Sequence, residues 1–121
     1  MLIKCFKHCS DDVKILLFKT FCCSMYCSHL WSCFSTVVFR KLKTAFNRIF
    51  RTLMCLDRRA SISKAMLDSK INTFDINVRK YIYSFMVRLS NSSNLVICTL
   101  LNSLHYMNST IVRHWHKKLY V

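Results

Sequence analysis

The longest regular pattern of hydrophobic and polar positions in this chain lies between residues 35 and 56. Apolar residues recur there at three- and four-residue intervals, which a helix places on one face: Leu42, Ala45, Phe46, Ile49, Phe50 and Leu53. Basic residues lie mostly on the opposite face: Arg40, Lys41, Lys43, Arg48 and Arg51. Burying each large apolar side chain contributes about 1.5–3 kcal/mol, so the apolar face needs a partner surface. The pattern predicts a helix over 35–56 with one face in a core and a basic face outward.

The same periodicity predicts further helices on both sides of this one. Residues 10–31 are apolar nearly all round, which favours a buried helix that begins at Ser10 and exposes Lys14 and Lys19. A short helix over 61–68 begins at Ser61, an amphipathic helix covers 73–90, and C-terminal helices, the last capped by Ser109, cover 95–120. No sustained alternation predicts a strand. The sequence therefore predicts an all-α fold, a single helical domain or fragment over 1–121, built as an irregular bundle of about five to six helices.

The chain contains no Gly and no Pro among its 121 residues. Glycine commonly supplies the left-handed conformation that ends a helix. We therefore expect Asn, Ser or Asp to form the turns. The absence of both residues also suits a fragment or a drifting reading frame better than an optimised domain.

Eight cysteines raise the question of metal or disulfide chemistry. Cys5 and Cys9, like Cys23 and Cys27, are separated by three residues, and no C-x-x-C pair accompanies them. Thiols inside an apolar helical run behave as small hydrophobic groups, so we expect them to be buried and free. His114 and His116 are two residues apart, which on a helix directs them to different faces. The sequence predicts no metal site and no cofactor.

No catalytic constellation can be assembled from this sequence. The chain contains no Glu, and its five acidic residues are all Asp at expected helix or loop boundaries. A Gly-rich phosphate loop is impossible without Gly. Asp11 and Asp12 could be imagined as a polymerase metal pair, but a helical pattern follows them, so we interpret them as favourable charges at a helix start. We expect no enzymatic activity from the chain alone.

Charge favours a polyanionic partner, since nineteen Lys and Arg against five acidic residues give a formal net charge of +14. We expect RNA or DNA backbone to be bound through basic helix faces, by phosphate contact without base readout. The candidate binding residues are Arg40, Lys41, Lys43, Arg48, Arg51, Arg58, Arg59, Arg79 and Lys80. Tyr26, Trp31 and Trp115 are expected to serve as core residues more than as base-stacking platforms.

Four segments of the chain resemble the carboxyl-terminal region that follows the polymerase palm in non-LTR (LINE-type, jockey-like) retrotransposon reverse transcriptases. They are CSDDVKILLFKTFCCSMYCSHLW, KLKTAFNRIFRTLMCLDRRASISKAM, FDINVRKYIYSFMVRL and RHWHKKLYV. The matching positions of the most specific pattern are Leu42, Ala45, Phe50, Arg51, Leu53, Leu56, Arg58, Arg59, Ser61 and Ser63. The chain departs from the family at Cys55 and Asp57, where Gly and Pro are usual, and at Ile62, where Ala is usual.

The resemblance implies an accessory role. The palm's aromatic-Ala-Asp-Asp motif is missing from this chain, so polymerase activity does not carry over. Thumb-like helices would hold template and primer for an upstream polymerase domain of the same element, in the nucleus or cytoplasm, and no signal peptide is expected. Two alternatives stay open: a cationic membrane-associated helical protein, suggested by the uncharged stretch from Thr20 to Phe39, and a translated relic without selected function.

Overall fold

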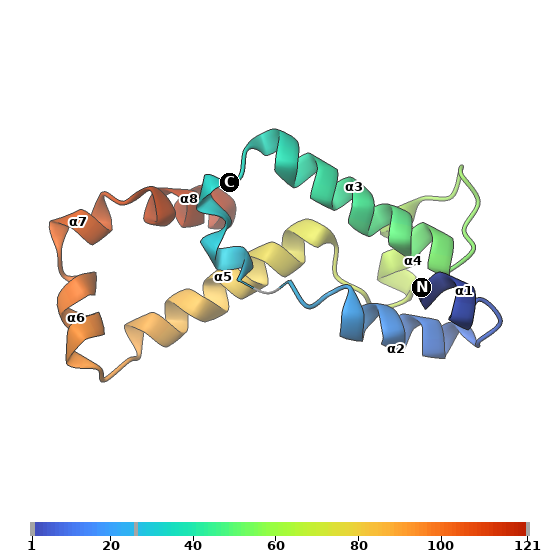
Figure 1. The fold of residues 1–121 in the computed structure, drawn as a ribbon, viewed down its shortest axis with the longest axis horizontal. Coiled ribbons are helices and arrows are strands. Elements are labelled where there is room, and N and C mark those ends of the chain that lie inside the picture. The colour runs from blue at the N-terminus through green and yellow to red at the C-terminus, as the bar shows by residue number, and fades with distance from the viewer. Residues whose placement is uncertain (1, 26, 121) are drawn as a thin grey trace. The chain divides into compact units, whose positions relative to one another are not determined.

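The computed structural model describes residues 2–25 and 27–120 and confirms the all-α fold (Figure 1). Within these ranges the chain forms eight α-helices and one 3-10 helix, and no strand, so the helices exceed the five to six expected. Their bounds are α1 Leu2–Phe6, α2 Asp11–Phe21, the 3-10 helix η1 Ser28–Cys33, α3 Thr36–Leu53, α4 Ile62–Asp68, α5 Phe74–Ser90, α6 Leu95–Leu101, α7 Leu104–Met107 and α8 Thr110–Leu119.

The chain divides into two compact units, where the sequence analysis treats it as one domain. Unit 1 consists of Met1–Met25 and Ser35–Asn77, and unit 2 consists of Tyr26–Phe34 and Val78–Val121. The division falls within α5, between Asn77 and Val78.

Aromatic packing between α2 and α3 forms the core of unit 1. The ring centroid of Phe18 lies 5.0 Å from that of Phe46 and 5.1 Å from that of Phe50, and Phe46 also meets Phe74 at the start of α5. These tilted and edge-to-face arrangements are the favourable ones for aromatic pairs. Phe50 is completely buried, so α3 is held to α2 through its aromatic face.

The helix predicted over 10–31 is wrong in length and in burial. α2 ends at Phe21, and Leu16 and Phe21 are 64% and 61% exposed. Only Lys14 and Phe18 are buried on α2, because one side of the helix meets the core and an all-round apolar sequence has no second partner there. Lys14 was expected to be exposed but is buried, and its ammonium lies 3.5 Å from the Asp11 carboxylate. Ser10 holds the N-cap position without a side-chain cap hydrogen bond.

Serine and asparagine side chains start five helices, as the sequence predicts at Ser61 and Ser109. Each oxygen accepts a backbone N–H two or three residues ahead, which satisfies an otherwise unpaired donor of the first turn. The capping residues are Ser35, Ser61, Asn94, Ser103 and Ser109. Caps at Ser103 and Ser109 divide the predicted region 95–120 into α6, α7 and α8, which raises the helix count.

The turns that end α3 and α4 use residues other than the Asn, Ser or Asp that the sequence predicts. Cys55 and Lys70 adopt the left-handed conformation with φ values of 53° and 52°, as does Cys27 before η1 with a φ of 55°. None of these three residues is Asn, Ser or Asp. After α3, the N–H of Leu56 donates to the Arg51 carbonyl at 2.9 Å and the N–H of Cys55 donates to the Thr52 carbonyl at 3.3 Å. This pair of bonds is the Schellman motif, which favours Gly at the left-handed position.

Trp115 of α8 organises the core of unit 2. It is 2% exposed, as expected for a core residue, and its indole N–H donates to the His29 carbonyl of η1 at 2.6 Å. Its ring and that of Phe85 of α5 meet edge to face, and the His29 imidazole stacks on the same Phe85 with centroids 3.9 Å apart. Tyr26 lies outside the described residues. Trp115 and Phe85 therefore join η1, α5 and α8.

None of the helices in the described ranges combines the length and the apolar composition that crossing a membrane requires.

Candidate nucleic-acid interface

A shallow hollow of 390 Å³ lies along the outward face of α3 in unit 1. Its lining residues recur at three- and four-residue intervals, so they share one face of the helix. They are Val37, Arg40, Lys41, Thr44, Ala45 and Arg48. This set is called the α3 hollow below.

The α3 hollow is exposed because the large apolar residues of α3 gather on the opposite side. Phe39, Phe46, Phe50 and Leu53 are buried, and Phe39 was not part of the predicted stripe. Ala45 and Ile49 were predicted to face inward, but both are exposed, Ile49 by 39%. The buried arc is narrower than predicted, because three phenylalanines and one leucine already fill the contact with the rest of unit 1.

Three cations of the α3 hollow have no protein partner in the described part of the chain. Arg40, Lys41 and Arg48 are exposed, and no ion pair or side-chain hydrogen bond between described residues engages them. No carboxylate belongs to the lining of the hollow. Positive charge that is not neutralised locally attracts anions over a distance set by ionic strength.

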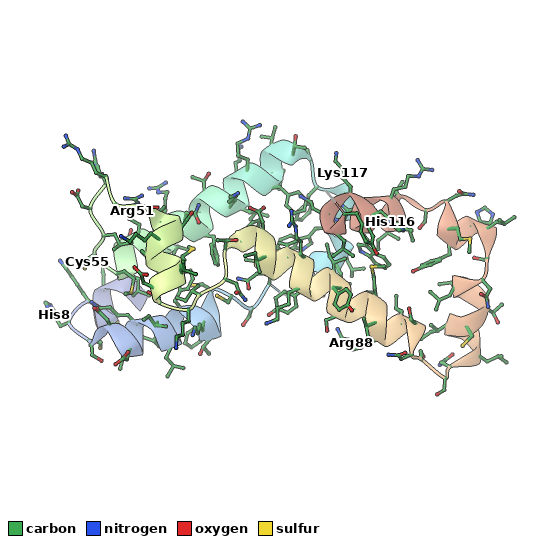
Figure 2. All side chains as sticks on the ribbon, turned by 180° about the vertical axis from the view of Figure 1, so that it is seen from behind. His8, Arg51, Cys55, Arg88, His116 and Lys117 are labelled. Carbon is green, nitrogen blue, oxygen red and sulfur yellow. The ribbon has the colours of Figure 1, made fainter. Side chains whose placement is uncertain are left out.

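Lys43 and Arg51 were also predicted to bind nucleic acid, but unit 1 itself uses both. The ammonium of Lys43 lies 2.5 Å from a carboxylate oxygen of Asp75. The Arg51 guanidinium donates to the backbone carbonyls of Asp57 and Ala60, the latter at 3.2 Å. Figure 2 labels Arg51, in the last turn of α3, and Cys55, in the segment that follows the helix. Arg51 thus fastens residues 54–60 to the helix, and Lys43 joins α3 to α5.

The other four predicted residues are not among the lining residues of the α3 hollow. Arg58 and Arg59 are exposed in the segment between α3 and α4. Arg79 and Lys80 are exposed on α5 and belong to unit 2. The nine predicted residues therefore separate into the three cations of the hollow, two cations engaged within unit 1, two in a connecting segment and two in unit 2.

Thr44 is a member of the hollow that charge alone could not reveal. Threonines within α2, α3 and α6 donate their hydroxyl to the carbonyl four residues back, as Thr20, Thr52 and Thr99 do. Thr44 makes no such bond with a described residue, so its hydroxyl can donate to a ligand. The signal in the sequence is its position midway between Arg40 and Arg48, four residues from each.

The cysteine thiols are a second group of candidate ligands. Burial raises the pKa of the Cys22 thiol, and the neighbouring Cys23 adds to the effect. Burial also raises the pKa of Cys23, against smaller lowering effects from Asn77 and Lys19. None of the eight cysteines, all of which lie in the described ranges, forms a disulfide, and the expectation that they are buried is wrong, since each is exposed or half-buried. Among the residues that the structure describes, no three His, Cys, Asp or Glu side chains lie close enough to hold a metal ion.

Two histidines of unit 2 have perturbed pKa values. Burial lowers the pKa of His29, and the nearby Arg88 lowers it further. Burial lowers the pKa of His114 in the same way, with Lys118 and Lys117 adding to it. Both imidazoles are thus held toward the neutral form.

A comparison with protein families, curated proteins and solved structures gives no match to this chain. The α3 hollow and its three cations are therefore the observations that support a function.

Proposed function

We propose that this chain binds the phosphate backbone of a nucleic-acid duplex through the α3 hollow and has no catalytic role of its own. The observation that supports this most directly is the grouping of Arg40, Lys41 and Arg48 around one hollow without a carboxylate in its lining. Their charges are not used within the described part of unit 1. A phosphate strand would supply the missing anions.

The chemistry of the hollow suits phosphate contact without base readout. Arginine, lysine and threonine side chains are common donors to phosphate oxygens, and such contacts fix position without reading sequence. Arg40 and Arg48 are eight residues apart, which on a helix is about 12 Å. The remaining lining residues, Val37 and Ala45, are aliphatic and offer no aromatic surface for a base. A backbone strand of about three nucleotides would therefore cover the hollow, given about 3.4 Å of axial rise per phosphate on each strand.

The resemblance to the region after the palm of LINE-type reverse transcriptases supports a particular duplex. In that context the ligand is the template–primer hybrid, and the catalytic palm is an upstream domain of the same element. The chain would act as an accessory segment that holds the hybrid by counterion release. This role requires neither a metal nor a cofactor from the chain itself.

Neutralising the three cations together tests the proposal. In the variant Arg40→Gln/Lys41→Gln/Arg48→Gln, we expect affinity for a fluorescently labelled 16-base-pair RNA–DNA hybrid to fall on the order of 100-fold at 0.1 M salt. The slope of log K against log salt should become less steep by about 2.7, because each lost phosphate contact removes about 0.9. Fluorescence anisotropy between 0.05 and 0.2 M salt measures both quantities.

A charge-matched control separates the hollow from net charge. Lys7→Gln/Lys19→Gln/Lys64→Gln removes three exposed cations elsewhere in unit 1 and should change the slope far less. Equal slopes for the two triple variants would reject the α3 hollow as the binding surface. Partition of the native chain into neutral lipid vesicles, without retention on the hybrid, would instead favour the membrane-associated alternative.

A further inference from the structure

The outward face of α5 in unit 2 carries an exposed aromatic ring between charged and aliphatic neighbours. Tyr83 is 63% exposed. Arg79 and Lys80 precede it by one turn and Val87 follows it by one turn, and all three are exposed. A helix places these four positions on one face, and the buried Val78 and Ile82 lie outside that face. This set is called the α5 stripe below.

Tyr83 and Tyr120 are both exposed aromatic side chains of unit 2, but their surroundings differ. Tyr120 is 74% exposed, yet its ring stacks on the His116 imidazole with centroids 5.4 Å apart. Tyr83 makes no ring contact and no side-chain hydrogen bond with a described residue. Both the face of its ring and its hydroxyl are therefore available to a ligand.

The cations of the α5 stripe have no acidic side chain in their own unit. All five acidic residues of the chain belong to unit 1. The nearest in sequence is Asp75, one turn before Arg79 on α5, and its carboxylate is paired with Lys43. Figure 2 labels Arg88 further along the same helix, where its guanidinium lies over the Phe85 ring. Arg88 is thus engaged with Phe85, whereas Arg79 and Lys80 share a helix face with Tyr83.

We propose that the α5 stripe binds single-stranded nucleic acid, with one base stacked on Tyr83 and neighbouring phosphates on Arg79 and Lys80. An exposed aromatic ring beside cations is the combination that proteins use for single strands, because every base has a stacking face. A paired base inside a duplex is already stacked on its neighbours, which makes an unpaired strand the better ligand. The inference rests on the proposed function and deepens it, since it assigns unpaired nucleotides to unit 2 and the duplex backbone to the α3 hollow.

Removing the ring tests the inference directly. In Tyr83→Ala, we expect affinity for a labelled octamer of uridine to fall about 5- to 150-fold, the range for loss of one stacked base. The salt slope should stay unchanged, because no charge is removed. In Arg79→Gln/Lys80→Gln, the slope should become less steep by about 1.4, at about 0.7 for each contact to a single strand. Anisotropy titrations give both numbers.

Two further variants keep the test specific. Tyr83→Trp should retain binding to the uridine octamer. The octamer should quench the tryptophan fluorescence of this variant more than it changes the fluorescence of the native protein. Tyr120→Ala removes an exposed ring already stacked on His116 and should leave affinity for the octamer unchanged. Circular dichroism of each variant verifies that these surface substitutions leave the fold intact.

The result separates this inference from the proposed function. Native chain that does not bind the octamer, or Tyr83→Ala that binds it as the native chain does, would overturn the α5 stripe as a single-strand site. Duplex titrations run in parallel report on the α3 hollow, which stands or falls by its own triple variant. Equal losses for octamer and duplex in Tyr83→Ala would also overturn the assignment of separate ligands.

Discussion

The two compact units both present basic helix faces, but the surroundings of the charges differ. On α3 in unit 1, Arg40 and Arg48 surround small and aliphatic side chains in a shallow hollow. On α5 in unit 2, Arg79 and Lys80 stand beside the exposed ring of Tyr83. Unit 1 also contains every acidic residue of the chain and uses one of them on Lys43, whereas unit 2 contains none.

This difference shows that a count of positive charges does not define a binding site. Nine basic residues looked equivalent in the sequence, yet Lys43 and Arg51 make bonds within unit 1. The cations of the α3 hollow and those of the α5 stripe differ in the side chains that lie beside them. Aliphatic neighbours leave only phosphate contact, and an exposed aromatic neighbour adds base stacking.

The largest effect is expected in the aromatic core that supports the basic face of unit 1. Phe50→Ala removes a completely buried ring that packs on Phe18, and should lower the free energy of unfolding by about 3–5 kcal/mol. Urea denaturation followed by circular dichroism measures the loss. Phe21→Ala is the matched control, because Phe21 is 61% exposed and its loss leaves no cavity. Equal losses in the two variants would contradict this description of the core.

A smaller effect of opposite sign is expected at the turn that ends α3. Cys55 is an L-residue with φ at 53°, which costs about 1–2 kcal/mol relative to right-handed backbone. Cys55→Gly removes that cost from the folded state, but glycine also increases the conformational entropy of the unfolded chain, which offsets part of the gain. We therefore expect a net stabilisation of about 1 kcal/mol. The exposed Cys33, at the end of η1 in unit 2, has no positive φ, so Cys33→Gly should not stabilise. Destabilisation by Cys55→Gly would contradict the assigned turn.

The smallest expected effect is a pH dependence of stability in unit 2, which contains both histidines with lowered pKa values. Below the ordinary pKa near 6.5, the unfolded chain binds protons that folded His29 and His114 resist. The free energy of unfolding should therefore be highest above about pH 6.5 and should decline as the pH falls below that value. Thermal unfolding at pH 7.5 and pH 5 measures the decline.

A substitution at His29 identifies the source of this pH dependence. His29→Phe keeps a ring to stack on Phe85 and removes the titrating imidazole, so it should reduce the decline. His105→Gln, at an exposed position of α7, is the control and should leave it as it is. A decline of the same size in His29→Phe would exclude His29 as a contributor.

The sequence predicted the elements whose apolar pattern covers one helix face. The helix predicted over 35–56 is observed over Thr36–Leu53, and the one over 73–90 over Phe74–Ser90, because a one-sided stripe states both period and orientation. The prediction for 10–31 was wrong, because a helix that is apolar on all sides does not indicate which face packs inward or where the helix ends. Periodicity could not place Cys55 in a left-handed turn or Arg51 on two carbonyls, because both depend on where the chain goes after α3.

The sequence could predict the positive charge of the candidate site, but it could not predict which basic residues belong to the site. Arg40, Lys41 and Arg48 follow from the outward face of the helix. The pairing of Lys43 with Asp75 joins residues 32 positions apart, which no local pattern encodes. The exposure of Tyr83 likewise follows from which side of α5 packs inward.

Chemical-shift mapping of the labelled chain with the 16-base-pair hybrid tests the central claim most directly. We expect the largest amide shifts on the α3 hollow, at Val37, Arg40, Lys41, Thr44 and Arg48, with amides of α1 and α4 nearly unchanged. Shifts concentrated on α1 or α4, with the α3 hollow unaffected at saturating hybrid, would contradict the claim that its unpaired cations hold phosphates.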